Sequence, residues 1–188
     1  MFSEIKKKIS ISLGKNICNT NLTWITPELT TTYDRKIEYF NYVFIPIILS
    51  LAFSDICNTK VHNSITLIGR TFGIDFIEGF SEMFNTKNEV YNSLSSSLST
   101  LNLSTIVPLT KYLAFKLGSK NITVNSAAFG PIKDIDSEVL IKSHKNKMLN
   151  LTSFTKSDVI ESLDFFYDAS NEYMTGQIIK YDGGASIC

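Results

Sequence analysis

The chain has 188 residues, of which 44% are hydrophobic and 19% are charged, a composition that excludes an intrinsically disordered chain and predicts one globular domain over residues 1–188. Lysine plus arginine and aspartate plus glutamate each number 18, so the formal net charge is zero. Because there is no excess of basic residues, the charge gives no support for a nucleic acid or an anionic membrane as partner.

Apolar periodicity predicts helices and a strand in the first half of the chain. Apolar residues recur at helical spacing over 2–13, which predicts a first helix there. A longer, mostly buried helix is expected over 34–57, with a kink at Pro46. The stretch 39–54 lacks charge but is 16 residues long, short of the ~20 needed to cross a bilayer. We therefore expect a buried interface helix and no membrane span. The β-branched run 64–68 predicts a buried strand.

The second half predicts two further helices and two further strands. A long helix is expected over 95–117, with a kink at Pro108 and Gly118 as its cap. Thr155 can cap a helix over 157–167 with its hydroxyl. Because long crossover helices separate the strands, the alternation predicts a parallel α/β sheet. The two strands are expected at 122–126 and 176–181.

The cysteines and histidines predict neither a disulfide framework nor a metal site. Cys18, Cys57 and Cys188 are odd in number and widely spaced, which favours a reducing, cytoplasmic compartment. His62 and His144 have polar sequence neighbours, so we expect solvated surface side chains and not ligands or bases.

Five short motifs follow one another in the last eighty residues. They are Leu109–Ala114, Asn121–Asn125, Phe129–Ile132, Asp158–Val159 with Phe165–Gln177, and Asp182–Gly184. Their order and spacing resemble the closing segments of the short-chain dehydrogenases/reductases, a family of nicotinamide-dependent enzymes. The resemblance is strongest over 109–188. It implies an α/β fold with a Rossmann-like parallel sheet and flanking helices.

The same resemblance implies that the usual first βαβ unit is lacking. No glycine-rich turn of the type G-x-x-x-G-x-G occurs, and in the family that turn lets backbone N–H groups approach the pyrophosphate. Gly130, Pro131 and Ile132 match the family turn whose backbone contacts the nicotinamide carboxamide, and they form a weak cofactor site. We therefore expect no cofactor, and NAD(P) if there is one.

The family's catalytic Ser, Tyr, Lys and supporting Asn correspond by this resemblance to Arg70, Ser99, Leu103 and Asn41, so only Asn41 is retained. A serine has no proton that titrates near neutral pH without an activating base, and a leucine cannot bind a ribose hydroxyl. No other confident catalytic residue is identified.

Two other hydroxyls are the alternative proton donors. Thr71 follows Arg70 directly, and Tyr91 lies eight residues before Ser99. No lysine follows Tyr91 by four or by seven residues, however, so the family's Tyr–Lys pairing is not restored there. The sequence therefore favours a pseudoenzyme over an active reductase.

Two functional interpretations follow. The first is a catalytically impaired structural or regulatory subunit that associates with itself or with an active relative. In the family, two long helices form one dimer interface, which here implies 34–57 and 95–117, with Leu109 and Leu113 as interface positions. The alternative is an NAD(P)-dependent oxidoreductase with a rearranged site, acting on a sugar or acyl carbonyl or hydroxyl.

Overall fold

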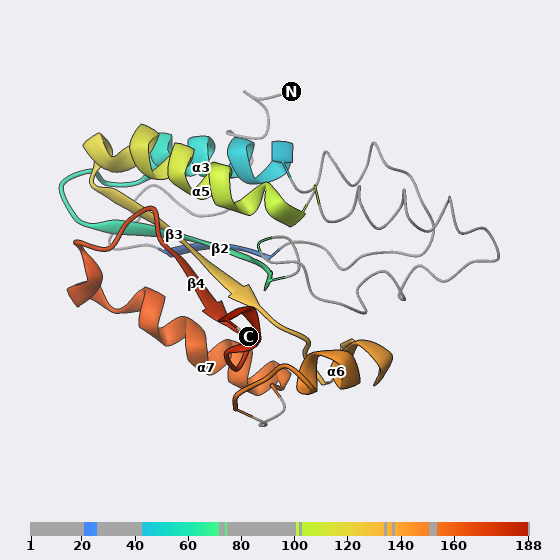
Figure 1. Ribbon diagram of the computed structural model, residues 1–188. Helices are drawn as coiled ribbons and strands as arrows, with labels where there is room; N and C mark the ends of the chain where they lie inside the picture. Colours follow the sequence, from blue (N-terminus) through green and yellow to red (C-terminus); the bar gives the residue numbers. More distant parts are fainter. Residues whose placement is uncertain are drawn as a thin grey trace.

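The structure is a computed structural model that describes 21–25, 43–71, 74, 101, 103–133, 135–136, 138–150 and 154–187. These residues form three layers (Figure 1). Helices α3 (Ile45–Ile56) and α5 (Ile106–Leu117) cover one face of a sheet, and α7 (Lys156–Tyr167) covers the other. The helix expected over 2–13 lies outside the described residues.

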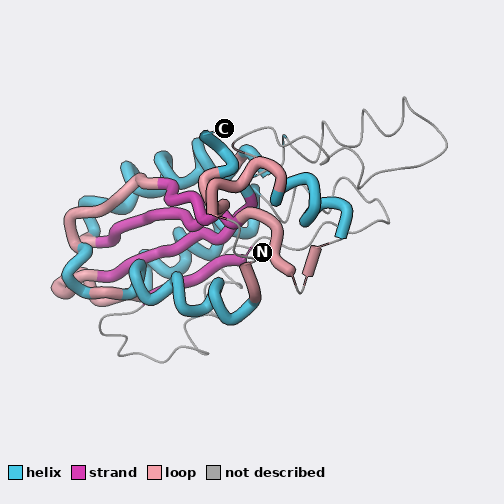
Figure 2. Tube along the Cα trace, turned by 60° about the horizontal axis from the view of Figure 1, so that its bottom comes forward, coloured by secondary structure: helices cyan, strands magenta, loops and turns pink. Residues whose placement is uncertain are grey.

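The sheet has four strands, β1 (Asn21–Ile25), β2 (Asn63–Arg70), β3 (Ile122–Phe129) and β4 (Ile178–Tyr181), in the order β1-β2-β3-β4. All three pairings are parallel, and Figure 2 shows the strands side by side between the helices. The predicted parallel α/β sheet is confirmed. Within the described residues β1 is the last strand at its edge of the sheet.

Two apolar cores hold the layers together. One lies between the sheet and the helices α3 and α5, and includes Phe53, Leu113 and Val124, each at most 1% exposed. The other lies between the sheet and α7, around Phe129 and Phe166. Because β2 and β3 are buried on both faces, their sequences read as nearly continuous apolar or small residues.

The two prolines predicted to kink the long helices lie near the helix starts, and Gly118, predicted as a cap, lies at a helix end. Pro46 lies in the first turn of α3, where its missing N–H has no intrahelical partner to lose. A turn at Thr105, three positions before Pro108, separates α5 from the helical residues before it. Gly118 ends α5 with a right-handed φ of −57°, and the left-handed position falls on Asn121, after the 3-10 turn η4 (Gly118–Lys120).

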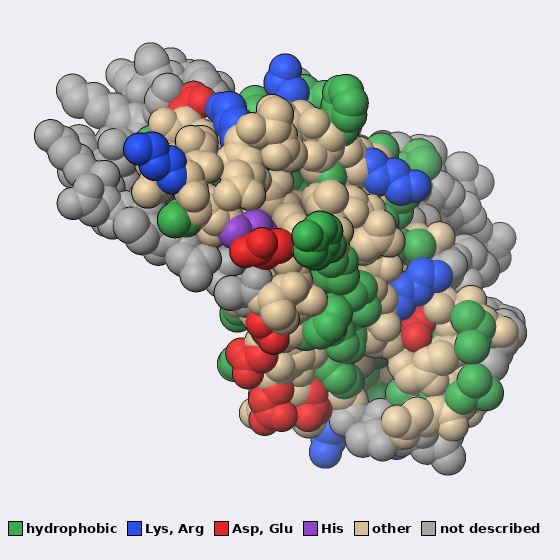
Figure 3. Space-filling view, turned by 90° about the vertical axis from the view of Figure 1, so that its left-hand side faces the viewer, with side chains coloured by type: hydrophobic (Ala, Val, Ile, Leu, Met, Phe, Trp, Pro, Cys, Tyr) green, Lys and Arg blue, Asp and Glu red, His purple; other side chains and the backbone are tan. Residues whose placement is uncertain are grey.

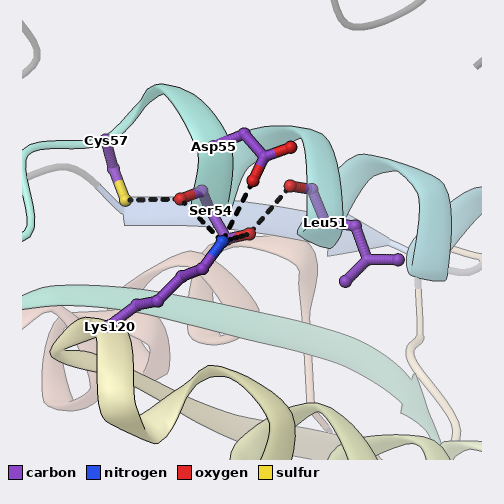
Figure 4. A network of polar contacts seen from close by, with 5 residues as sticks. All are labelled: Leu51, Ser54, Asp55, Cys57 and Lys120. Atoms are coloured by element: carbon purple, nitrogen blue, oxygen red, sulfur yellow. Dashed lines mark hydrogen bonds and ion pairs between the residues drawn. The ribbon is translucent and has the colours of Figure 1, made fainter. Parts of the chain in front are cut away.

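Lys120 ties α3 to the end of α5. Its ammonium group lies 3.1 Å from Ser54 Oγ, 3.4 Å from the Ser54 carbonyl oxygen and 3.0 Å from Asp55 Oδ1 (Figure 4). A cation at this point stabilises the last carbonyls of α3, which carry the negative end of the helix dipole. The contact thus fixes how the two helices of one layer sit relative to each other.

The start of α7 has the expected cap. Thr155 Oγ1 accepts a hydrogen bond from Asp158 N at 3.4 Å, and Asp158 Oδ2 accepts one from Thr155 N at 2.7 Å. This reciprocal pair satisfies two N–H groups that the helix leaves without partners. The prediction of a helix entered through Thr155 is confirmed.

The charge-free stretch 39–54 contributes α3, whose Ala52 and Phe53 are buried in the core. Across the described part of the chain, the helices are too short or too polar to traverse a membrane.

Hydrophobic side chains also remain on the described surface. Figure 3 shows a band of them (green) on the face that forms the left-hand side of Figure 1, with acidic side chains (red) along one flank. The large exposed hydrophobic residues on or near α5 and α7 are Leu101, Tyr112, Phe115, Ile160, Phe165, Tyr167 and Tyr173.

Candidate site at the carboxyl edge of the sheet

The carboxyl ends of β2, β3 and β4 meet at one edge of the sheet, which is where parallel α/β sheets bind ligands. Arg70, the last residue of β2, pairs with Phe129 at the end of β3, and Phe129 pairs with Tyr181 at the end of β4. The register therefore brings together Arg70, the turn 130–132 and Asp182.

Asp136 organises this edge. One of its oxygens, Oδ2, accepts a hydrogen bond from the Arg70 guanidinium and another from the Ile132 backbone N–H, the latter at 2.6 Å. The Arg70 and Asp136 side chains are only 18% and 9% exposed. Arg70, the residue predicted at the family's serine position, thus helps to hold the turn after β3 in place.

The backbone donors of that turn are engaged within the chain. Gly130 N donates to Tyr181 O at 2.9 Å, and Lys133 N donates to Phe154 O at 2.8 Å. Pro131 has no N–H, and Ile132 N is held by Asp136. The residues from Gly130 to Ile132 are also buried. The turn therefore does not fit a nicotinamide carboxamide, because it has no backbone donor left to offer.

The other two candidate site residues that the structure describes, Leu103 and Thr71, are buried. Leu103 is 3% exposed and contributes to the apolar interior. Thr71 is fully buried, and its hydroxyl donates to Phe129 O at 3.4 Å, so it faces β3. Asn41, Tyr91 and Ser99 lie outside the described residues. The structure thus brings Arg70, Thr71 and the turn 130–132 to one edge.

His144 is the residue of this edge that sequence reasoning missed. It lies on α6 (Glu138–Lys145), is 2% exposed, and its Nε2 lies 3.1 Å from Asp182 O. Burial lowers the pKa of His144, because the charged imidazolium loses water. The expectation of a solvated side chain is wrong. The available signal was its i, i+4 spacing from Leu140, which places both on one helix face.

Gly130 is required by this histidine. A Cβ on Gly130 would lie 2.8 Å from His144 Nε2. The family-like turn can therefore pass this close to α6 only with a glycine at that position.

The Asp182–Gly184 motif forms a second turn beside the first. Asp182 Oδ1 accepts from Gly184 N at 3.0 Å, and Oδ2 accepts from Ser186 N at 3.1 Å. Gly183 and Gly184 have φ of 64° and 85°, values that favour glycine. Both carboxylate oxygens are therefore committed to the turn. Over the described ranges, no group of three His, Cys, Asp or Glu residues is arranged to hold a metal ion.

The chain is similar to enoyl reductases in its second half. The family model described as enoyl-(acyl carrier protein) reductase matches residues 103–186. An enoyl-[acyl-carrier-protein] reductase [NADH] of Rickettsia felis is 31% identical over 103 residues, which cover 52% of this chain and 38% of that protein. The matched region is therefore well under half the length of the curated relative.

Solved structures show the same architecture. The enoyl-[acyl-carrier-protein] reductase (NADH) from Aquifex aeolicus VF5 superposes with a TM-score of 0.75 at 14% identity, covering 100% of this chain and 72% of that one. A 4-hydroxyisoleucine dehydrogenase complexed with NADH gives 0.67 at 20% identity, covering 99% and 78%. At such identities the likeness establishes the fold. The ordered motifs, the family-model match and the curated relative together make the second half of the chain similar to the short-chain dehydrogenase/reductase family.

Proposed function

We propose that this chain is a degenerate short-chain dehydrogenase/reductase that does not reduce substrates and acts as a structural or regulatory subunit. The observation that carries the proposal is the Asp136 carboxylate, which binds both Arg70 and the Ile132 N–H. The Asp136 carboxylate thereby engages Arg70, which is predicted at the catalytic serine position. It also engages the Ile132 N–H, which is the backbone donor predicted for the nicotinamide.

The chemistry of these side chains supports the proposal. A reductase needs a group that can donate a proton near neutral pH, and the Arg70 guanidinium does not lose its proton in that range. Leu103, at the position of the lysine, is apolar and buried. Neither Arg70 nor Leu103 therefore supplies an acid.

The first experiment is a search for turnover. The purified chain is mixed with NADH or NADPH and a panel of aldehydes, ketones and enoyl thioesters, and the nicotinamide absorbance is followed. We expect no enzyme-dependent change. Turnover above ~0.01 s⁻¹, far below a typical enzyme, that disappears in Thr71→Ala or Tyr91→Phe would establish a relocated site and contradict the proposal.

The alternative is an NAD(P)-dependent oxidoreductase with a rearranged site. The family-model match and the enoyl reductase of Rickettsia felis favour an acyl substrate over a sugar for it. Calorimetry with NADH and NADPH separates the two functions. We expect weak binding or none, because the turn donors are engaged and the sequence has no glycine-rich phosphate turn. A micromolar Kd that weakens in Ile132→Ala would favour the alternative.

An outward face of α5 supports the role as a subunit. Tyr112 and Phe115 are 50% and 89% exposed, and with the exposed Pro108 they follow a spacing of four and three residues along α5. Apolar side chains at this spacing form the seam between paired helices. Leu109 and Leu113, the positions predicted for an interface, are 8% and 0% exposed and belong to the core. We therefore place the contact, with a second copy or an active relative, on the opposite side of α5.

Light scattering tests the self-association part of this proposal. We expect the chain to form an oligomer that dissociates in Phe115→Glu or Tyr112→Glu and persists in Thr59→Glu, an exposed control with the same added charge. A monodisperse 21.1 kDa species that melts cooperatively would contradict self-association. A variant at Leu109 is unsuitable, because it would unfold the core.

A further inference from the structure

A cavity of about 390 Å³ lies beside the turns described above. It is bounded by α6, by 148–150, by the start of the α7 region and by 180–184. Its volume falls within the range of about 300–1,000 Å³ typical of small-molecule sites. It shares Gly130 and Pro131 with the turn after β3, whereas Arg70 and Leu103 do not line it.

One wall of the cavity is apolar and partly aromatic. Phe154 and Tyr181 line it and belong to a ring cluster in which both pack on Phe129, with centroids 5.5 Å and 5.1 Å apart. Ile141 and Met148 face the same space. Because their far sides are packed in the core, the two rings present fixed surfaces to the cavity. A planar apolar body can stack on such a surface.

The charged residues of the cavity give it a cationic rim. Lys133, Lys145 and Lys180 come from three different segments, the turn after β3, α6 and β4, and all three are exposed. A ligand anion at the mouth would meet positive charge from several sides, which favours its binding.

The other titratable groups that line the cavity offset this positive charge only in part. The Asp182 carboxylate accepts from two backbone N–H groups, and the Asp158 carboxylate accepts from Thr155. His144 contributes no charge at neutral pH, because burial lowers its pKa. Three lysines against two aspartates leave the lining with a net positive charge.

We infer that this cavity binds a small planar organic anion, an aromatic body that stacks on Phe154 and Tyr181 with one carboxylate at the lysine rim. The cavity borders the turn 130–132, but neither Arg70, Leu103 nor the exposed residues of α5 line it. The inference therefore stands whether or not the chain has reductase activity.

Calorimetry with 2-naphthoate tests the inference on the full chain. We expect saturable binding of one naphthoate per chain that weakens as ionic strength rises, since exposed lysines are screened by salt. The cation 2-naphthylmethylammonium has the same body with the opposite charge, and we expect no saturable binding of it. Absent naphthoate binding, or equal binding of the cation, would overturn the inference.

A matched pair of triple variants locates the site. Lys133→Gln with Lys145→Gln and Lys180→Gln removes the rim, and we expect about tenfold weaker binding of naphthoate from three exposed charges. The control variant, with Lys60, Lys111 and Lys116 changed to Gln, loses the same charge at exposed positions outside the cavity and should bind as the parent does. Equal loss in both variants would show non-specific attraction and overturn the inference. Cooperative melting of each variant verifies its folding.

Discussion

Replacing Asp136 with alanine removes the one oxygen that holds both Arg70 and the Ile132 N–H. Removing one partner of a buried ion pair costs about 3–5 kcal/mol, and stranding a buried amide costs about 1–3 kcal/mol. Together these costs come to about 4–8 kcal/mol. Because Arg70 is 18% exposed and can regain water, we take a value below that range. The expected loss in the free energy of unfolding is ~3 kcal/mol, or roughly 6–12 °C in Tm for a chain of this length.

Urea unfolding followed by circular dichroism measures this loss. Asp164→Ala, on the exposed side of α7, is the control and should stay within ~0.5 kcal/mol of the parent. In the double variant Arg70→Met with Asp136→Leu both charges leave together, so it should lose less than Asp136→Ala alone. The reasoning is refuted if Asp136→Ala behaves like the control, or if the double variant is the less stable of the two.

Three further changes test local features by the same unfolding measurements. Thr155→Ala should lower the free energy of unfolding by ~1 kcal/mol at neutral pH. Hydrogen bonds from Thr155 lower the pKa of Asp158, so this loss should become smaller below about pH 4, where the carboxylate is protonated. The parent should lose stability below about pH 6.5, because His144 takes up a proton in the unfolded chain more readily than in the buried site. The variant His144→Gln should lack this pH dependence. A parent whose stability does not change below that pH would contradict the burial argument. Gly183→Ala should cost ~1–3 kcal/mol, since φ is 64° and the new Cβ would lie 2.4 Å from Met148 Cε; a neutral effect on Tm would show that the turn adapts.

The amino-acid sequence by itself determined the elements whose signals are local. The run 64–68 lies within β2 and 122–126 within β3, because apolar and β-branched residues buried on both faces specify a strand wherever it is placed. The helix after Thr155 was equally predictable, since its capping residues are three apart. The order of these elements was enough to predict a parallel sheet, and the motifs after residue 109 were enough to indicate the family.

The sequence did not determine which side of an apolar helix meets the sheet. On α5 the residues Leu109 and Leu113 form one apolar stripe, and Tyr112 and Phe115 form another. Both have helical spacing, so periodicity treats them alike. Only the packing of α5 on β3 buries the first pair and leaves the second exposed, and this moves the proposed interface to the opposite face from the one predicted.

The tertiary structure alone decided the chemistry of the carboxyl edge. Arg70 and Asp136 are 66 residues apart, and His144 meets Asp182 across 38 residues, distances over which local propensity carries no information. Parallel register brings these groups together because each strand ends at the same edge of the sheet. The family resemblance predicted which catalytic side chains are replaced, but the fold determined that Arg70 is paired with a carboxylate that also holds the Ile132 amide.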